Sequence, residues 1–373
     1  MANIEVSMQR VERFREIMRE RGYNAAILRN NPDLRWLTTA ERTFDDEVAH
    51  TAFITLDGLW LHTDSRYYGT LVSRLGDKSP WQLDMDVVNP EWWAAQMVKR
   101  THSHVVAVED SWTLGFYEAF ERELASASLA CLLPRLHGDI ETLRIVKDAE
   151  EIELMRHAQS ITDAAFEHIV GYIKAGMTEM QIKNELESFM FAHGADALSF
   201  GTIVAAGPNG ANPHAQPSDY VVQAGDFITM DYGAGYGDYH SDMTRTVCVG
   251  EPSDEQRRVY DTVLLANETI RKEARAHLIG KDVHMRAVEI ISDAGYGDYF
   301  KHGLGHGVGI QIHEKPFFNR TYEEEIPAGS VVTDEPGIYL PGKFGVRIED
   351  FGVVDEDGYH IFTASPHELQ IVG

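Results

Sequence analysis

Hydrophobic residues in the first third of the chain recur at two different spacings. Val11, Phe14 and Met18 lie three and four residues apart among polar residues, which predicts an amphipathic helix over about 8–21 that Gly22 ends. Short apolar runs predict strands, two of which flank the hairpin turn Asp57-Gly58. The predicted strands are 25–28, 51–56 and 59–62, and the further predicted helices are 92–99 and 115–127. Strands that alternate with helices indicate a small α/β domain over about residues 1–130.

The pattern changes in the rest of the chain. Apolar residues at a spacing of three or four predict a long charged helix over 148–173, and another helix follows Thr178. From Ser199 onward, short apolar runs typical of strands alternate with glycine-rich turns. The predicted strands are 227–232, 243–249, 331–334 and 346–354. We place the domain boundary near residue 135 and expect domains at 1–135 and 136–373.

Composition restricts the classes of function. The 373 residues include 33 Lys and Arg against 59 Asp and Glu, which makes the formal net charge −26. That charge repels phosphate backbones and anionic lipids, so we expect no nucleic acid and no membrane as partner. No apolar stretch is long enough to span a bilayer, residues 1–22 do not read as a signal peptide, and two cysteines predict no disulfide framework. A cytoplasmic location is therefore expected.

The first candidate site lies in a glycine-rich hairpin between the predicted strands 227–232 and 243–249. If its turn centres on Tyr236-Gly237, Asp231 and Asp242 lie directly opposite each other on one face. Like charges in that position repel, so the pair needs either a cation or exposure to water.

The segment 331–350 repeats this arrangement. A three-residue turn at 341–343 places Glu335 opposite Glu349. Either carboxylate pair alone is compatible with solvated side chains on an acidic chain. Because both pairs lie among apolar strand residues, together they favour a site for cations.

Histidines lie before and between the two carboxylate pairs. In the segment from His302 to His306 and beyond, alternate glycines leave one strand face without side chains, so that another backbone or a ligand approaches closely. His306 is the strongest candidate, whereas His302, and His214 at the end of a loop, are equally compatible with structural roles. His313 is seven positions from His306, so a shared site requires a bulge or bend.

The candidate ligand set is rich in oxygen. Four carboxylates and one neutral imidazole carry a total charge of −4, which two divalent cations neutralise. Such a set suits Mn²⁺, Co²⁺, Fe²⁺ or Zn²⁺ and lacks the thiolates that select softer metals. The candidate ligands are Asp231, Asp242, His306, Glu335 and Glu349.

These five residues resemble the metal ligands of the pita-bread metallopeptidases, which include methionine aminopeptidase, aminopeptidase P and prolidase. The flanking motifs His-Gly-Leu-Gly-His, Glu-Pro-Gly-Ile-Tyr and Val-Arg-Ile-Glu-Asp carry the resemblance. The segments at 31–38 and 61–68 resemble the creatinase/prolidase N-terminal domain, which indicates the Xaa-Pro branch. The resemblance implies an α+β fold, with a pita-bread catalytic domain and a smaller α/β N-terminal domain, and a homodimer.

The resemblance also implies a role for each candidate ligand. Asp242, His306 and Glu335 would hold one metal ion and Asp231 the other, while Asp242 and Glu349 would bridge the two ions. Manganese is the expected metal. Glu335 would also take a proton from a water that the two ions share and hold as hydroxide against the scissile carbonyl.

Four further residues match positions that the family uses around the metal ions. His214 and His313 match histidines that contact the substrate or stabilise the tetrahedral intermediate, so they are candidate catalytic residues. His302 matches a histidine near the proline pocket, and Arg347 matches an arginine that supports the acidic ligands.

The predicted function is therefore that of a dinuclear-metal exopeptidase acting on peptides with proline at the second position. Relatives that cleave dipeptides tend to carry an arginine where Phe317 stands, which favours an aminopeptidase P-like enzyme over an Xaa-Pro dipeptidase. A non-catalytic binding protein of this fold is an alternative that the complete ligand set disfavours. Phosphoester hydrolysis is another, and it lacks a basic cluster for phosphate.

Overall fold

The computed structural model describes residues 2–45, 47–85 and 88–373, and it divides into two compact units. The first unit ends at Arg144 and the second runs from Ile145 to Gly373. The predicted boundary near residue 135 falls before this division, in the segment that precedes the helix α6. Across the described ranges, no helix combines the length and the apolar character needed to cross a membrane.

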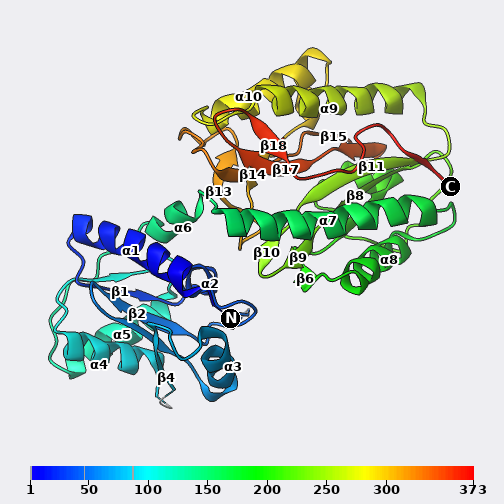
Figure 1. Ribbon diagram of the computed structural model, residues 1–373. Helices are drawn as coiled ribbons and strands as arrows, with labels where there is room; N and C mark the ends of the chain where they lie inside the picture. Colours follow the sequence, from blue (N-terminus) through cyan, green and yellow to red (C-terminus); the bar gives the residue numbers. More distant parts are fainter. Residues whose placement is uncertain (1, 46, 86–87) are drawn as a thin grey trace. The chain divides into compact units, whose positions relative to one another are not determined.

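The first unit is built on a mixed five-stranded sheet in the order β4-β3-β2-β1-β5. β1 pairs antiparallel with β2 and parallel with β5, and the predicted hairpin joins β2 to β3. Helices cover both faces of this sheet, as Figure 1 shows for α1 and α4. The strands are β1 (Ala25–Leu28), β2 (Thr51–Thr55), β3 (Leu59–His62), β4 (Gln82–Asp84) and β5 (Val106–Val108). The helices are α1 (Ile4–Arg21), α2 (Asn31–Thr38), α3 (Ser65–Leu75), α4 (Pro90–Thr101), α5 (Leu114–Ser126) and α6 (Asp139–Arg144).

The predicted elements of this unit are confirmed. The apolar face of α1 is buried through Val11, Phe14 and Met18, and Gly22 ends the helix in the left-handed conformation that glycine adopts without strain. The helix begins earlier than predicted because the side chain of Asn3 accepts a hydrogen bond from the backbone of Val6 and caps the first turn.

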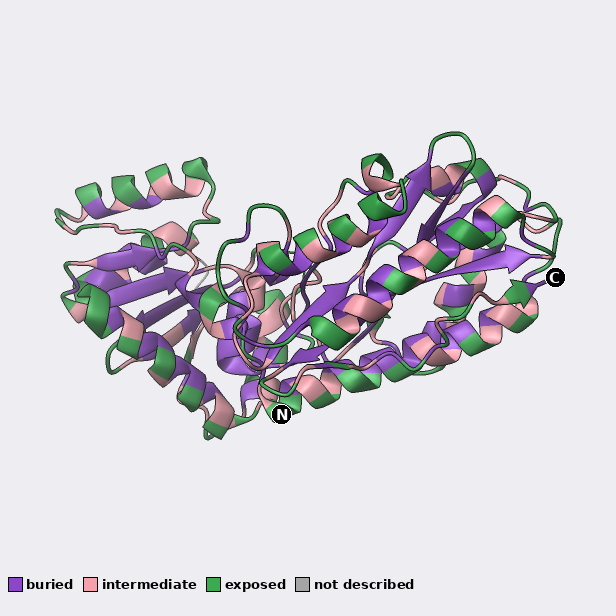
Figure 2. Cartoon of the chain, turned by 90° about the horizontal axis from the view of Figure 1, so that it is seen from above, coloured by how far each residue is buried: buried purple, intermediate pink, exposed green. Residues whose placement is uncertain are grey.

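The second unit places two pairs of helices over strands that lie between them. α7 and α8 share a hydrophobic core with β7, β8 and β11, and α9 and α10 share another with β14 to β17. Figure 1 shows these helix pairs on opposite sides of the strands. In Figure 2 the strands are almost entirely buried, whereas each helix exposes its outer face. The helices are α7 (Ala149–Tyr172), α8 (Glu179–Ala192), α9 (Asp254–Glu273) and α10 (Gly280–Asp293).

The strands of the second unit form four sheets. Their orders are β19-β11-β8-β7, β13-β12-β14-β17-β18, β10-β9-β6 and β15-β16. Those that precede α9 are β6 (Ala197–Leu198), β7 (Ile203–Ala206), β8 (Phe227–Tyr232), β9 (Ala234–Tyr236), β10 (Tyr239–His240) and β11 (Met243–Val249). Those that follow α10 are β12 (Gly305–Gly307), β13 (Glu314–Phe318), β14 (Ser330–Asp334), β15 (Gly337–Leu340), β16 (Phe344–Arg347), β17 (Asp350–Val354), β18 (Tyr359–Ile361) and β19 (Ile371–Val372).

The register predicted for the first carboxylate hairpin is wrong by two residues. Asp231 pairs with Thr244 rather than with Asp242, which lies just before β11. The reason is the tip of the hairpin, where both Gly237 and Asp238 have positive φ angles, of 58° and 69°. Two left-handed residues form the tight turn that suits a hairpin, and this turn lies one position later than the predicted one. Asp242 stays on the side of β11 that Thr244 shares, so both aspartates still reach one site.

The second carboxylate hairpin has the predicted register but an unpredicted interruption. Gly337 pairs with Arg347, and Asp334 pairs with Asp350, which places Glu335 opposite Glu349. The predicted strand 346–354 is divided between β16 and β17 because the backbone changes partner there. The amide of Glu349 donates to the carbonyl of Thr244 (3.0 Å), and that of Glu335 to the carbonyl of Leu304 (2.8 Å). The hairpin thereby binds both β11 and the histidine segment.

Candidate metal centre

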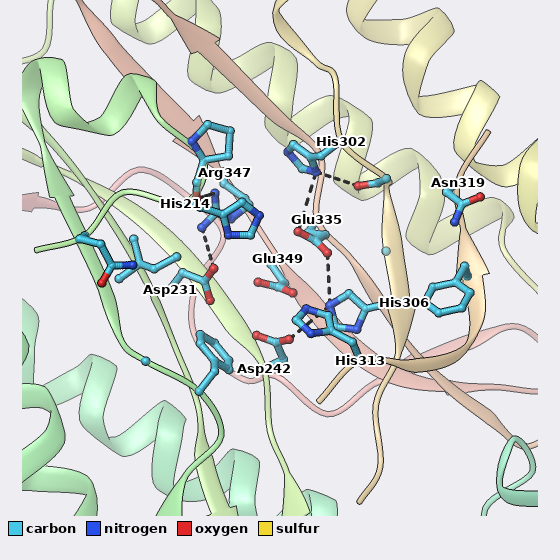
Figure 3. Close-up of a pocket in the computed structure, with 18 residues that line it drawn as sticks. His214, Asp231, Asp242, His302, His306, His313, Asn319, Glu335, Arg347 and Glu349 are labelled. Carbon is cyan, nitrogen blue, oxygen red and sulfur yellow. Dashed lines mark hydrogen bonds and ion pairs between the residues drawn. The ribbon is translucent and has the colours of Figure 1, made fainter. Parts of the chain in front are cut away.

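One cavity in the second unit, of about 480 Å³, collects all the side chains that were expected from the sequence to ligate metal, bind substrate or take part in catalysis. The side chains come from both carboxylate hairpins, from the histidine segment and from the loop after β7. Figure 3 shows them facing a common space. These nine residues are His214, Asp231, Asp242, His302, His306, His313, Glu335, Arg347 and Glu349.

The ligand atoms at the centre of this cavity lie close enough together to share an ion. One atom each from Asp242, His306 and Glu349 lies within 4.8 Å of the other two. Nε2 of His306 is 3.6 Å from Oδ2 of Asp242 and 3.5 Å from Oε1 of Glu335. Ligands that each lie about 2.0–2.3 Å from one ion have such separations from each other.

Asp231 is fixed through one oxygen only. Its Oδ2 accepts a hydrogen bond from Nη2 of Arg347 at 2.6 Å, whereas its buried Oδ1 has no hydrogen-bond partner among the described residues. Arg347 is itself held in place, since it also donates to the hydroxyls of Thr244 (3.0 Å) and Tyr339 (2.8 Å). A buried carboxylate oxygen without a partner is costly, and a metal ion would supply the missing one.

The two glutamates are oriented by threonines. The hydroxyl of Thr244 donates to Oε2 of Glu349 at 2.6 Å, and the hydroxyl of Thr333 to Oε1 of Glu335 at 3.4 Å. Thr244 thus connects the guanidinium of Arg347 to the carboxylate of Glu349. Hydrogen bonds of this kind fix ligand orientation before an ion binds.

The electrostatics of the cluster favour the binding of a cation. Burial, and then the neighbouring carboxylates, raise the pKa values of Asp242 and Glu349 well above their ordinary range. Burial chiefly raises the pKa of Glu335 to about 8, and burial lowers the pKa of His306 to about 4. The imidazole is therefore a neutral nitrogen donor at pH 7, and a bound cation would favour the ionised form of Asp242, Glu335 and Glu349. The residues present fit a centre for divalent metal.

The glycine-rich histidine segment makes the close approaches that the sequence predicts. A Cβ atom on Gly305 would lie 2.1 Å from the carbonyl oxygen of Thr333, and one on Gly307 would lie 2.3 Å from that of Lys315. The predicted irregularity is present, because the pairing of β12 with β13 shifts register between His306 and Gly307. The ring centroids of His306 and His313 are consequently 4.3 Å apart.

His302 lies in the wall of the cavity and contacts Tyr339. Its Nδ1 is 2.7 Å from the carbonyl oxygen of Gly303 and its Nε2 is 2.9 Å from the hydroxyl of Tyr339. Since a carbonyl only accepts, we infer that Nδ1 carries the proton and that Tyr339 donates to Nε2. Burial lowers the pKa of His302 to about 3, which keeps this ring neutral.

His214 is exposed at the cavity, beside Pro213, whose carbonyl accepts a hydrogen bond from Arg347 at 3.3 Å.

Several residues of the site were not predicted from the sequence. Thr244 supports the site through Arg347 and Glu349, and its position two residues after Asp242 was a usable signal, because alternate residues of an extended segment share a face. Tyr339 supports it through His302 and Arg347, and no local pattern indicated that role. Several residues that line the cavity also carried no signal in the sequence: Phe200, Ile203, Gln216 and Asn319.

Comparison with known proteins decides the family. Residues 153–356 match Metallopeptidase family M24, and residues 10–146 match the Creatinase/Prolidase N-terminal domain. The chain belongs to metallopeptidase family M24. The predicted resemblance is confirmed, and so is the pita-bread catalytic domain with its N-terminal domain. The chain is a metallo-exopeptidase, so the alternatives of a non-catalytic binding protein and a phosphoesterase are set aside.

Solved structures similar to this chain cover nearly all of it, and a curated relative covers most of it. The Xaa-Pro dipeptidase from Bacillus anthracis matches with a TM-score of 0.91 and 35% identity, over 98% of this chain and 100% of that one. The X-Pro aminopeptidase from Thermotoga maritima MSB8 matches with a TM-score of 0.87 and 33% identity, over 97% and 99% of the two chains. The Xaa-Pro dipeptidase of Lactobacillus helveticus is 35% identical over 312 residues, which are 83% of this chain and 82% of that protein.

Proposed function

We propose that this family M24 peptidase removes the first residue from peptides whose second residue is proline, and that it acts on peptides longer than two residues. The observation that carries the proposal concerns Arg347. It is the single lysine or arginine among the described residues that line the cavity, and its guanidinium is engaged with Asp231, Thr244 and Tyr339. A dipeptide presents its terminal carboxylate near the reacting bond, and such a carboxylate calls for a cation that is free to pair with it.

Phe317 supports the same reading. It lines the cavity at the position where dipeptide-cleaving relatives tend to carry an arginine. An aromatic side chain offers apolar contact to a continuing peptide and no counter-charge to a carboxylate. This favours aminopeptidase P-like cleavage.

The proposed metal arrangement follows the ligand set. We expect two divalent ions, most readily Mn²⁺, with Co²⁺, Zn²⁺ or Fe²⁺ also suited to these donors. Asp242, His306 and Glu335 would hold one ion and Asp231 the other, with Asp242 and Glu349 shared between them. When bound, such ions supply Lewis acidity and lower the pKa of water.

Three side chains would carry out proton transfer, oxyanion stabilisation and substrate contact. Glu335, whose pKa is raised to about 8 when no cation is present, accepts the proton of the attacking water. His313, beside His306, donates a hydrogen bond to the carbonyl oxygen as negative charge develops on it. His214, exposed at the cavity, contacts the substrate.

Proline at the second position suits this cavity. The nitrogen of proline carries no hydrogen, so a peptidase that binds substrate as an added strand loses a hydrogen bond there. A pocket that receives the ring avoids that loss. We assign this pocket to the part of the cavity wall that His302 forms, where a contact of 2.9 Å with the hydroxyl of Tyr339 holds the imidazole.

A second candidate function is hydrolysis of Xaa-Pro dipeptides. It is favoured by the relatives from Bacillus anthracis and Lactobacillus helveticus, each named an Xaa-Pro dipeptidase. The homodimer that the family resemblance implies and the cytoplasmic location both stay predictions.

The experiment that tests the proposal compares Ala-Pro-Ala, Ala-Pro and Ala-Ala-Ala as substrates, with each metal added in turn to metal-free protein. We expect hydrolysis of Ala-Pro-Ala and none of Ala-Ala-Ala. Faster cleavage of Ala-Pro than of Ala-Pro-Ala would establish the dipeptidase instead. The variants Glu335→Gln and His306→Ala serve as controls, and substantial turnover by either one would refute the assigned roles.

A further inference from the structure

We propose that Lys147 is a positioning residue that holds His313 in place through Glu314, an inference that rests on the proposed function. Nζ of Lys147 lies 2.7 Å from Oε1 of Glu314, and the two side chains are only 1% and 5% exposed. Glu314 follows His313 directly in the chain and begins β13. Neither Lys147 nor Glu314 lines the cavity, so they act behind the site rather than in it.

A buried ion pair of this kind needs a reason beyond stability. Removing two charges from water costs several kcal/mol for each ion, and apolar replacements of such pairs are often neutral or stabilising. The contact between Lys147 and Glu314 is a charge contact rather than a well-aligned hydrogen bond. We therefore infer that the role of this ion pair is to fix the position of the Glu314 carboxylate.

The carboxylate of Glu314 is enclosed by the loop that leads to His313. A Cβ atom on Gly309 would lie 2.4 Å from Oε1 of Glu314, so the backbone of this loop passes directly over the carboxylate. The amide of Gln311 donates to Oε2 at 3.3 Å, and the amide of Gly309 donates to the carbonyl of Gln311 at 3.1 Å. The bend between His306 and His313 is thus built around the Glu314 carboxylate.

Lys147 in turn is attached to the sheet that carries His306. Its backbone amide donates to the carbonyl of Gly329 at 3.0 Å, and its neighbour Val146 forms a bridge with Ser330, the first residue of β14. β14 pairs with β12, the strand that contains His306. The charge contact therefore ties the loop of His313 to the same framework as His306, which maintains the 4.3 Å ring contact.

The test uses Lys147→Met in the full-length, metal-loaded enzyme. Because a displaced oxyanion donor acts only in the transition state, we expect kcat for Ala-Pro-Ala to fall by about 10- to 100-fold while KM and metal content stay unchanged. Hydrogen–deuterium exchange of residues 307–314 should become faster. Lys147→Arg keeps the charge and should recover part of kcat.

Lys183→Met is the matched control. Lys183 forms a partly buried pair with Glu187 on α8, with 2.8 Å between Nζ and the carboxylate, away from the cavity lining. This variant also loses a lysine from an ion pair, and it should leave kcat and the exchange of 307–314 at wild-type levels.

The double variant Lys147→Met/Glu314→Gln covers the case in which Lys147→Met fails to fold. It removes both charges while residue 314 still offers an acceptor to Gln311. We expect this protein to fold, with low kcat and fast exchange of 307–314. A folded single or double variant with wild-type kcat and exchange would overturn the proposal. If the wild type cleaves no Xaa-Pro substrate, the proposed function fails, whereas the exchange measurement still tests the positioning of the loop.

Discussion

Arg347 and Asp231 form a partly buried ion pair, with 2.6 Å between Nη2 and Oδ2, which joins the two hairpins of the candidate metal centre. Asp231 lies on β8 and Arg347 on β16, so residues from separate sheets are held in one geometry. The pair occupies one oxygen of Asp231 and leaves the other for an ion. A single arginine thereby orients a ligand and reduces repulsion among four carboxylates.

We expect Arg347→Met to lower metal affinity and kcat/KM by about 10- to 100-fold, because Asp231 loses its orientation and its counter-charge. Metal content by elemental analysis and hydrolysis of Ala-Pro-Ala measure the two effects. Arg257→Met, which breaks the exposed pair between Arg257 and Glu251, is the control and should change neither. Full metal occupancy together with wild-type turnover in Arg347→Met would contradict this role.

Metal binding should release protons at neutral pH. In the metal-free protein the pKa of Glu335 is about 8, chiefly because the carboxyl group is buried, so at pH 7 it is mostly protonated and must ionise when an ion binds. Titration calorimetry in two buffers of different ionisation enthalpy measures this release. We expect the part of the release that comes from Glu335 to fall as the pH rises through 8, and Glu335→Gln to release fewer protons than the wild type. An unchanged release in Glu335→Gln would show that another group is responsible.

The stability of the metal-free protein should fall as the pH rises from 6.5 to 8. The pKa of Glu335 is raised from 4.5 to about 8 in the folded chain. The protonated carboxyl group therefore stabilises the fold fully below pH 4.5, the pKa in the unfolded chain, and this stabilisation is lost as the pH rises through about 8, the pKa in the folded chain. The pKa values of His306 and His302 are lowered, so the stabilisation that their neutral rings provide is lost only when the pH falls below 6.5. The difference in Tm between metal-loaded and metal-free protein should therefore widen between pH 6.5 and 8. A constant difference would show that Glu335 is not protonated in the metal-free protein.

Phe317→Arg should shift the substrate preference toward dipeptides. A guanidinium at this position in the cavity would pair with the terminal carboxylate of Ala-Pro, and a hydrogen bond to a charged group corresponds to about a 10-fold gain in affinity. The ratio of kcat/KM for Ala-Pro to that for Ala-Pro-Ala measures the shift. Phe317→Leu, which is uncharged, should leave the ratio as in wild type. An unchanged ratio in both variants would remove Phe317 from the specificity argument.

Gly305→Ala should destabilise the fold by about 1–3 kcal/mol, the usual cost of overpacking. The added Cβ would lie 2.1 Å from the backbone oxygen of Thr333, which cannot move without disturbing β14. Gly303→Ala is the matched control, because its Cβ would lie 3.3 Å from its nearest neighbours and should cost less. Denaturant unfolding of both variants decides this, and equal free energies of unfolding would show that β12 and β14 adjust to the added methyl group.

Much of the site was predictable because its signals are local. The second hairpin has a three-residue turn with Gly342 in the left-handed conformation, and this turn sets the register that places Glu335 opposite Glu349. The spacing of Val11, Phe14 and Met18 likewise predicted α1, since a helix repeats every 3.6 residues whatever it packs against.

The sequence by itself determined the periodic elements and the chemical types of the ligands, because both depend on residue identity and short-range geometry. Only the tertiary structure decided the final register of the first hairpin and which residues of separate segments meet. The left-handed conformation of Asp238 moved the first hairpin by two positions, and the change of backbone partner at Glu349 divided a strand that looks continuous in its apolar pattern. The convergence of His306 and His313, and the pairing of Arg347 with Asp231, depend on contacts between distant segments, and no local pattern encodes the geometry of such contacts.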